Sequence, residues 1–89
     1  MKWRLVITPA VQSALSKFPS QTKRYIREAL GEIQKNPWGG KPLRDELTGF
    51  FSFRAKRFRI VYRIERHTIT VIVVSIGERK AVYKDLSSY

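Results

Sequence analysis

The sequence predicts a single α+β domain in which a helical hairpin packs on one face of a mostly antiparallel, four-stranded sheet. Two observations carry this prediction. Apolar residues recur with a helical period early in the chain, and they alternate with polar residues later. The expected order is strand, helix, helix and three strands. A chain of 89 residues has room for one core, so residues 1–89 are expected to form one domain.

The first expected elements are a strand and a short helix. Residues 2–7 are rich in β-branched and aromatic side chains, which favours a strand. Thr8 supplies an N-capping hydroxyl, and Pro9 suits the first position of a helix. The apolar face of this helix is expected to consist of Val11, Ala14, Leu15 and Phe18.

A second helix is expected over residues 21–35. Pro19–Ser20 should end the first helix and cap the second, and Asn36–Pro37 should end the second. The short connection predicts an antiparallel hairpin that lies across the sheet. Residues 38–49 contain several glycines and prolines and are expected to form a loop. The buried side of the second helix is expected to be Ile26, Ala29, Leu30 and Ile33.

Three strands are expected in the second half of the chain. Residues 51–55 and 58–64 alternate between apolar and polar, whereas residues 68–76 are apolar on both faces and predict the central strand. Their connections are so short that the strands should form an antiparallel meander. One face of the first two strands should be aromatic and branched and should pack on the helices. The other face should be a cationic surface that collects Ser52, Arg54, Arg59 and Arg63.

The composition favours a polyanionic partner. There are 18 basic and 7 acidic residues, giving a net charge of +11. Such a field suits nucleic acid, an acidic protein or an anionic membrane surface, although a generally basic surface is an alternative explanation. The longest apolar stretch, residues 69–76, is too short to span a bilayer, and the N-terminus lacks the apolar length of a signal peptide. A soluble, cytoplasmic protein is therefore expected.

Most common catalytic groups are missing from the sequence. It has no cysteine and a single histidine, His67, so thiol catalysis, a histidine pair and a cysteine–histidine metal site are not expected. The adjacent acids Asp45 and Glu46 are expected to form a turn. No metal or other cofactor is predicted. Arginine, lysine, tyrosine and serine remain, and these can support RNA cleavage, since RNA supplies its own 2′-hydroxyl nucleophile and guanidinium groups stabilise charge on phosphorus.

Three segments resemble one family of bacterial and archaeal toxins. The segments KPL…LTGFFSFR (residues 41–54), RFRIVYRI (57–64) and IGERKAVY (76–83), together with the order of elements, resemble the RelE/ParE superfamily over nearly the whole chain. The resemblance implies the toxin of a type II toxin–antitoxin system and a RelE-like, ribosome-dependent, metal-free mRNA endonuclease. It also implies contact with mRNA in the ribosomal A site and with 16S rRNA, and a cognate antitoxin as partner.

The resemblance also implies roles for particular residues. Arg59 is expected to stabilise the phosphate, Arg79 to assist the leaving group, and Tyr83 to stack on a base or take up a proton. These three are the predicted catalytic residues. The predicted RNA-binding residues are Arg54, Lys56, Arg57, Arg63 and Lys80.

The chain departs from the best-known RelE enzymes at two positions. Ser52 stands where those enzymes carry a second basic residue, and Glu78 stands where many carry histidine or lysine. Lys56 or Arg57 could supply the missing charge. Glu78 could either orient Arg79 or weaken it.

Two other functions are compatible with the same sequence. A ParE-like member would inhibit DNA gyrase without catalysis, and a third possibility is an inactive module that binds nucleic acid or antitoxin. The pair Arg79 and Tyr83 favours the nuclease, because a gyrase inhibitor does not need it. In a purely structural interpretation, Arg59 is a solvated sheet residue, Arg79 caps a short helix and Tyr83 packs its ring on the sheet.

Overall fold

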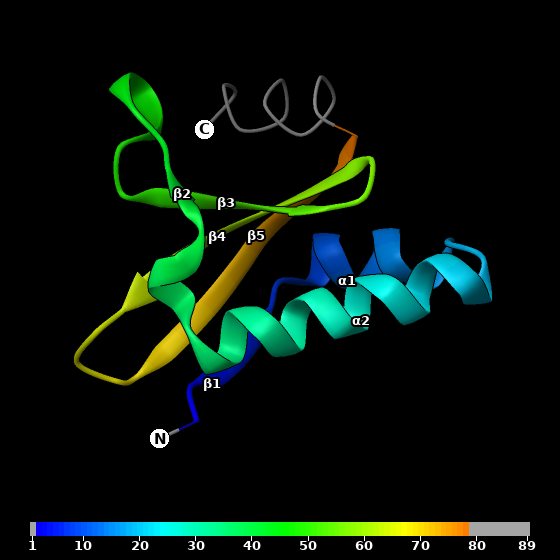
Figure 1. Ribbon diagram of the computed structural model, residues 1–89, viewed down its shortest axis with the longest axis horizontal. Coiled ribbons are helices and arrows are strands. Elements are labelled where there is room, and N and C mark those ends of the chain that lie inside the picture. The colour runs from blue at the N-terminus through cyan, green and yellow to red at the C-terminus, as the bar shows by residue number, and fades with distance from the viewer. Residues whose placement is uncertain (1, 79–89) are drawn as a thin grey trace.

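The computed structural model describes residues 2–78, and within them two α-helices lie on one side of a five-stranded sheet (Figure 1). The strand order is β1-β5-β4-β3-β2. Strand β1 runs parallel to β5, and the other neighbours are antiparallel, so the predicted α+β class and mostly antiparallel sheet are confirmed. The strands are β1 (Arg4–Ile7), β2 (Lys41–Pro42), β3 (Phe50–Ala55), β4 (Phe58–Glu65) and β5 (Thr70–Glu78).

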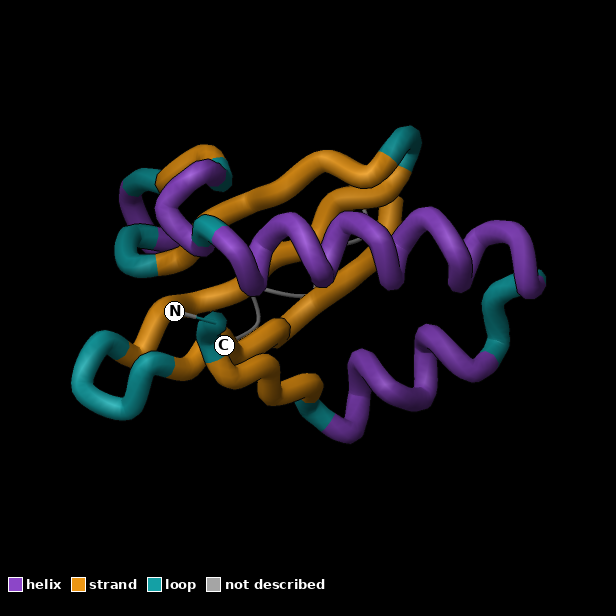
Figure 2. Tube along the Cα trace, turned by 60° about the horizontal axis from the view of Figure 1, so that its bottom comes forward, coloured by secondary structure: helices purple, strands orange, loops and turns teal. Residues whose placement is uncertain are grey.

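The two helices form the predicted hairpin, which Figure 2 shows as two neighbouring helices joined by a short turn. Helix α1 spans Pro9–Ser16, and the Thr8 hydroxyl accepts a hydrogen bond from the Val11 amide at 3.4 Å, as a capping residue should. Helix α2 spans Ser20–Lys35. Its N-cap position belongs to Pro19, whose extended backbone leads directly into the helix, so Ser20 is not the cap that the sequence predicted. Neither helix is long and apolar enough to cross a membrane, and residues 2–78 contain no other candidate.

The sheet has one strand more than predicted. Strand β2 falls within residues 38–49, which were expected to form a loop; Lys41 pairs with Ser52 and Pro42 with Phe51. Two residues are too few for an alternating pattern, and an edge position tolerates a proline, which lacks an amide hydrogen. The added strand also shifts the middle of the sheet to β4, so β5 is an interior strand but not the central one.

The main core lies between the helices and the sheet. The apolar face of α2 packs on side chains from β3, β4 and β5, and α1 contributes Val11. A phenylalanine cluster, in which Phe18 lies 5.1 Å from Phe58 between ring centroids, closes the core near the turn between the helices. The fully buried members include Ile26, Ile33, Ile60, Tyr62, Val71 and Val73.

Tyr62 joins the sheet to the segment that follows α2. Its side chain is completely buried, and its hydroxyl donates a hydrogen bond to the Pro37 carbonyl oxygen at 2.7 Å. A Cβ atom at Gly40 would overlap this hydroxyl, so only glycine fits there. Burial raises the pKa of Tyr62 from 10.0 to about 12, and a hydrogen bond with the Gly40 backbone partly opposes this effect. Tyr62 is therefore a neutral structural donor that fixes the approach to β2.

Candidate nucleic-acid interface

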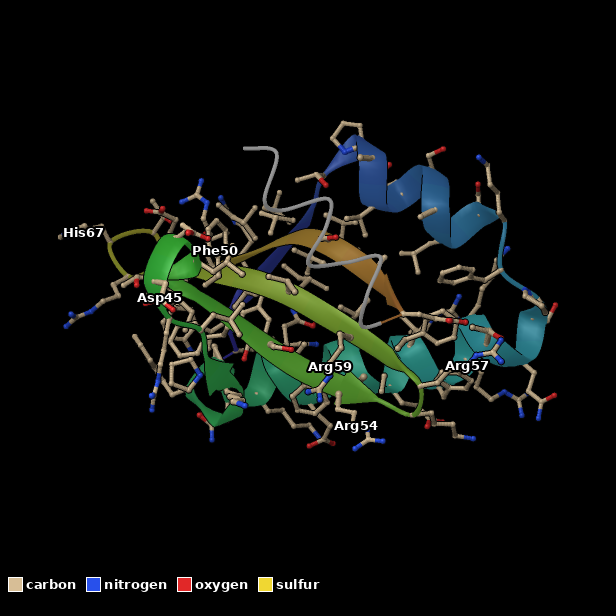
Figure 3. The ribbon with its side chains drawn as sticks, turned by 90° about the horizontal axis from the view of Figure 1, so that it is seen from above. Asp45, Phe50, Arg54, Arg57, Arg59 and His67 are labelled. Carbon is tan, nitrogen blue, oxygen red and sulfur yellow. The ribbon has the colours of Figure 1, made fainter. Side chains whose placement is uncertain are left out.

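The face of the sheet turned away from the helices, here called the open face, carries the predicted polar row. Cross-strand pairing places Arg54 opposite Arg59, Ser52 opposite Val61 and Phe50 opposite Arg63. Because paired residues project to the same side, the four predicted residues share one face, as the alternation indicated. Figure 3 looks onto this face and shows Arg54, Arg57 and Arg59 near one end, with Phe50 and His67 near the other.

The open face is not the continuous cationic surface that the sequence predicted. Ser52 is 2% exposed and Val61 is fully buried, although both project to this side. Val61 is the centre of a small group, here called the apolar cluster, because residues 43–50 fold over it. The open face is thus divided into an apolar middle and charged ends. The partly buried members that pack on Val61 are Leu43, Leu47, Phe50 and Val74.

Arg54 and Arg59 form a pair of like charges on the open face. They are direct cross-strand partners next to the β3–β4 turn. Arg54 donates from Nε to the carbonyl oxygen of Lys56 at 3.1 Å, which leaves its charge unneutralised. Among residues 2–78, neither arginine forms an ion pair, and Arg59 makes no side-chain hydrogen bond. Like charges placed opposite each other repel, so an anion bound between them would be stabilised.

Gly77 lies on the other side of Arg59. It is the cross-strand partner of Arg59 on β5, and a Cβ atom at this position would meet no atom of the described part of the chain within 4 Å. The row Arg54, Arg59 and Gly77 therefore presents two guanidinium groups beside an open position. Sequence analysis did not select Gly77 as a site residue; the available signal was a glycine inside a strand, which often marks a close approach of another backbone.

The other predicted RNA-binding residues within the described range have local partners. Arg57 lies 3.8 Å from Glu78 between Nε and Oε1, and its guanidinium lies over the Phe58 ring. The Lys56 ammonium lies 4.8 Å from the centroid of the Tyr25 ring on α2, and so is directed to the helix side. Arg63 forms an ion pair with Glu65. These three cations are partly compensated, whereas Arg54 and Arg59 are not.

The two departures from the RelE pattern have different structural settings. Ser52 is buried under the open face, and Glu78 is exposed at the end of β5 with Arg57 as its ion-pair partner. Glu78 therefore compensates a cation that was expected to replace the charge missing at position 52. Arg79, Lys80 and Tyr83 lie outside the described residues, so their predicted roles stay predictions.

The acidic residues and the histidine occupy turns. His67 is exposed at the tip between β4 and β5, and Asp45 begins a short 3-10 turn, as the sequence predicted for both. The Thr48 hydroxyl donates to the Asp45 carbonyl oxygen at 2.8 Å, which closes that turn. Across residues 2–78, no three histidine, cysteine, aspartate or glutamate side chains come together as a metal-binding group.

Comparison with known proteins points to one family. Residues 5–83 match a family model described as the ParE toxin of type II toxin–antitoxin system, parDE. The chain is 33% identical over 86 residues to Toxin RelG of Mycobacterium tuberculosis, covering 94% of this chain and 99% of that one. It is 31% identical over 84 residues to Toxin RelE of the same organism, covering 92% and 87%.

Solved structures give the same result. The toxin–antitoxin complex RelBE2 from M. tuberculosis contains a chain that is 32% identical, with a TM-score of 0.81 over 89% of this chain and 100% of that chain. A mutant of the E. coli toxin RelE in the free state has a TM-score of 0.79 at 22% identity, covering 99% and 97%, which is a likeness of fold.

Proposed function

Because the chain belongs to the RelE/ParE toxin superfamily of type II toxin–antitoxin systems, we propose that it is a ribosome-dependent endonuclease that cleaves mRNA without a metal ion. Its substrate is mRNA in the ribosomal A site, where 16S rRNA forms the surroundings. Its partner is a cognate antitoxin, in keeping with the complexes from which related toxins are known. It acts in the cytoplasm, where translating ribosomes are found.

The observation that supports this proposal is the pair Arg54 and Arg59. Two adjacent guanidinium groups without a carboxylate partner in residues 2–78 suit a phosphodiester, because each can donate two hydrogen bonds to phosphate oxygens. Among residues 2–78, no atom lies within 4 Å of a Cβ atom added at Gly77, and this space suits a sugar–phosphate backbone that lies against β5. An array of this kind binds the backbone of RNA irrespective of its bases.

In the proposed reaction, the 2′-oxygen of a ribose forms a bond with the adjacent phosphorus as the bond from phosphorus to the 5′-oxygen breaks. The 2′-hydroxyl loses its proton, and the departing 5′-oxygen gains one. Arg59 stabilises the negative charge that builds on the phosphate oxygens, and Arg54 neutralises the neighbouring backbone. Arg79 assists the leaving group and Tyr83 stacks on a base or takes up the 2′-proton. DNA has no 2′-hydroxyl and is not cut by this route.

The proposal is tested by primer extension on mRNA from cells that express the chain briefly. We expect discrete cuts within translated codons for the wild-type chain. Cutting should be strongly reduced for Arg59→Ala and should persist for Arg66→Ala, which removes an exposed cation at the far β4–β5 turn. A triple variant, Arg59→Ala, Arg79→Ala and Tyr83→Phe, that cuts as well as the wild type would contradict the proposed site.

Inhibition of DNA gyrase is the second candidate function. It is favoured by the description of the matching family as a ParE toxin. In that case the messages stay intact and DNA damage that depends on gyrase appears instead. An inactive binding module would give neither result, and its expression would leave both messages and DNA unchanged.

A further inference from the structure

Strand β2, which lies along the outer edge of β3 in Figure 1, places Lys41 on the open face beside the position of Ser52. Lys41 and Ser52 are cross-strand partners, so their side chains project to the same side of the sheet. Leu43, two residues further along the chain, packs on Val61 at the centre of the apolar cluster. Because side chains alternate along an extended segment, the contact of Leu43 independently fixes the direction of Lys41.

Lys41 extends the positive charge of Arg54 and Arg59 toward the edge of the sheet. Ser52 and Arg54 are two residues apart on β3, so Lys41 is the diagonal neighbour of Arg54 across the β2–β3 pair. Diagonal neighbours in a sheet lie about 7–8 Å apart, a separation that long side chains span. Arg54 is in turn the direct cross-strand partner of Arg59. The open face therefore carries three cations in succession, from the edge at β2 to the middle of the sheet at β4.

The charge of Lys41 is not compensated within residues 2–78. The residue is exposed, and its side chain forms no ion pair with this part of the chain. A hollow of about 530 Å³ lies beside β2, and within residues 2–78 it is lined by Lys41, Pro42, Leu43 and Arg44. Both charged members of this lining are cations, so the hollow is complementary to an anionic group.

Lys41 differs in this respect from the two residues that sequence analysis offered as replacements for the charge missing at Ser52. The Lys56 ammonium is directed to the helix side of the sheet. Arg57 is paired with Glu78 at the end of β5. Lys41 instead lies directly beside Ser52, on the face that carries the guanidinium pair. Neither composition nor alternation selects Lys41, because its position depends on the pairing of a two-residue strand.

We propose that Lys41 binds the RNA phosphate next to the one held by Arg54 and Arg59, and so supplies the positive charge that is missing at Ser52. The inference rests on the proposed nuclease function and adds a substrate-binding residue to that site. The RNA backbone then runs across the open face from β5 to the outer edge at β2. Lys41 acts on binding and on the path of the strand, and it takes no part in bond breaking, because the reacting phosphate lies at Arg59.

The test measures equilibrium binding of the full-length toxin to ribosomes programmed with an mRNA whose A-site codon carries 2′-O-methyl groups, which leave no 2′-hydroxyl to react. Lys41→Gln and Lys41→Ala remove the charge, and Lys41→Arg keeps it. The matched control is Lys35→Ala, which removes an exposed lysine of α2 that lies 3.9 Å from Glu32 between Nζ and Oε1. We expect both neutral variants to raise the Kd about tenfold, as for the loss of one charge-assisted hydrogen bond. Lys41→Arg and the control should change the Kd less than about threefold.

The salt dependence of the Kd distinguishes a phosphate contact from a structural effect. Loss of one contact with a single strand should reduce the slope of log Kd against log salt concentration by about 0.7, and Lys41→Arg should keep the wild-type slope. Thermal denaturation confirms that each variant is folded. A wild-type slope in both neutral variants would overturn the proposal.

The cleavage assay on unmodified mRNA keeps the two proposals apart. A wild-type toxin that binds with a slope dependent on Lys41 but does not cut would contradict the nuclease and support the phosphate contact. A wild-type toxin that cuts, with neutral variants that bind equally well, would support the nuclease and overturn the role of Lys41. A wild-type toxin that does not bind these ribosomes would overturn both.

Discussion

The covered and open faces of the sheet are built from the same strands but differ in what they do. On the covered face, side chains of β4 such as Ile60 and Tyr62 are completely buried, and the polar group of Tyr62 is satisfied inside the protein. On the open face, alternate residues of the same strand include Arg59, whose guanidinium has no partner within residues 2–78. The covered face stabilises the fold, and the open face keeps groups whose interactions are left for another molecule.

The two faces do not divide completely into a stabilising face and a functional face, because the middle of the open face is also buried. Val61 lies between Arg59 and Arg63 along β4 and is as inaccessible as the core residues. The apolar cluster therefore divides the open face into Arg54 and Arg59 at one end and the Arg63–Glu65 ion pair at the other. Position on a face does not by itself assign a residue to function; the presence or absence of a partner does.

The largest expected effect distinguishes these two ends. Arg59→Ala should lower the rate of mRNA cleavage by about 100- to 1000-fold, the range for loss of a group that stabilises transition-state charge. Arg63→Ala, the matched control on the same strand, should lower it by less than about threefold, because Glu65 already compensates that cation. Both should change the free energy of unfolding by less than about 0.5 kcal/mol. The measurements are single-turnover cleavage on programmed ribosomes and urea denaturation, and equal losses at both arginines would remove the distinction between the ends.

The next prediction concerns the covered face and pH. Because the pKa of Tyr62 is about 12 in the folded state against 10.0 when unperturbed, folding favours the neutral phenol. This stabilisation is complete below pH 10 and is lost as pH rises through 12, with a maximum of roughly 2 to 3 kcal/mol.

Urea denaturation of the wild type and of Tyr62→Phe between pH 8 and pH 12 measures this effect. At pH 8 the variant should be less stable by about 1 to 2 kcal/mol, since the Pro37 carbonyl oxygen loses its donor. The difference should shrink above pH 10, because only the wild type has a phenol to ionise. A difference that stays constant up to pH 12 would show that Tyr62 ionisation is not linked to unfolding.

Sequence periodicity predicted most of the fold, because it reports burial. The helical period located Ile26 and Ile33, and the alternation in β3 and β4 placed Arg54 and Arg59 on one face. Strand β2 was missed because it consists of two residues, one of them a proline. Such an element is set by its pairing with β3 and leaves no local pattern.

The site was predicted less completely for a related reason. Alternation says which way a side chain points, but it does not say which other side chain lies beside it. Arg57 pairs with Glu78, which lies 21 positions later in the chain. The Lys56 ammonium lies over the ring of Tyr25, which lies 31 positions earlier. The burial of Val61 and Ser52 likewise depends on tertiary contacts, including those of residues 43–50 with Val61.

A third experiment tests whether the buried middle of the open face contributes to the stability of the fold. Val61→Ala removes two methyl-sized groups from a fully buried site and should lower the free energy of unfolding by about 2 kcal/mol. Val6→Ala is the matched control; Val6 is 41% exposed, and the loss should be below about 0.5 kcal/mol. Urea denaturation measures both. Equal small losses would mean that the apolar cluster contributes nothing to stability and that the open face is purely a functional surface.

The smallest expected effect is a gain in stability at a glycine. Gly31→Ala should stabilise the free toxin by about 1 kcal/mol, because alanine is the better helix former and the added Cβ atom meets no described neighbour. For a domain of this size, 1 kcal/mol corresponds to a rise in Tm of roughly 4 to 8 °C. Thermal denaturation of the free toxin measures it, and a lower Tm would indicate that Gly31 is required by the fold itself.

Gly77→Ala is the matched comparison, since it also adds a Cβ atom that meets no described neighbour, but on β5 beside Arg59. At each glycine the added Cβ atom meets no atom of residues 2–78 within 4 Å, so each substitution should leave the folded state intact. If Gly77 is kept so that an RNA backbone can approach β5 closely, Gly77→Ala should impair only the steps in which RNA is bound. Gly77→Ala should then slow mRNA cleavage, whereas Gly31→Ala, in helix α2 on the other side of the sheet, should leave cleavage unchanged. Wild-type cleavage by Gly77→Ala would contradict a close approach of RNA to β5 at this position.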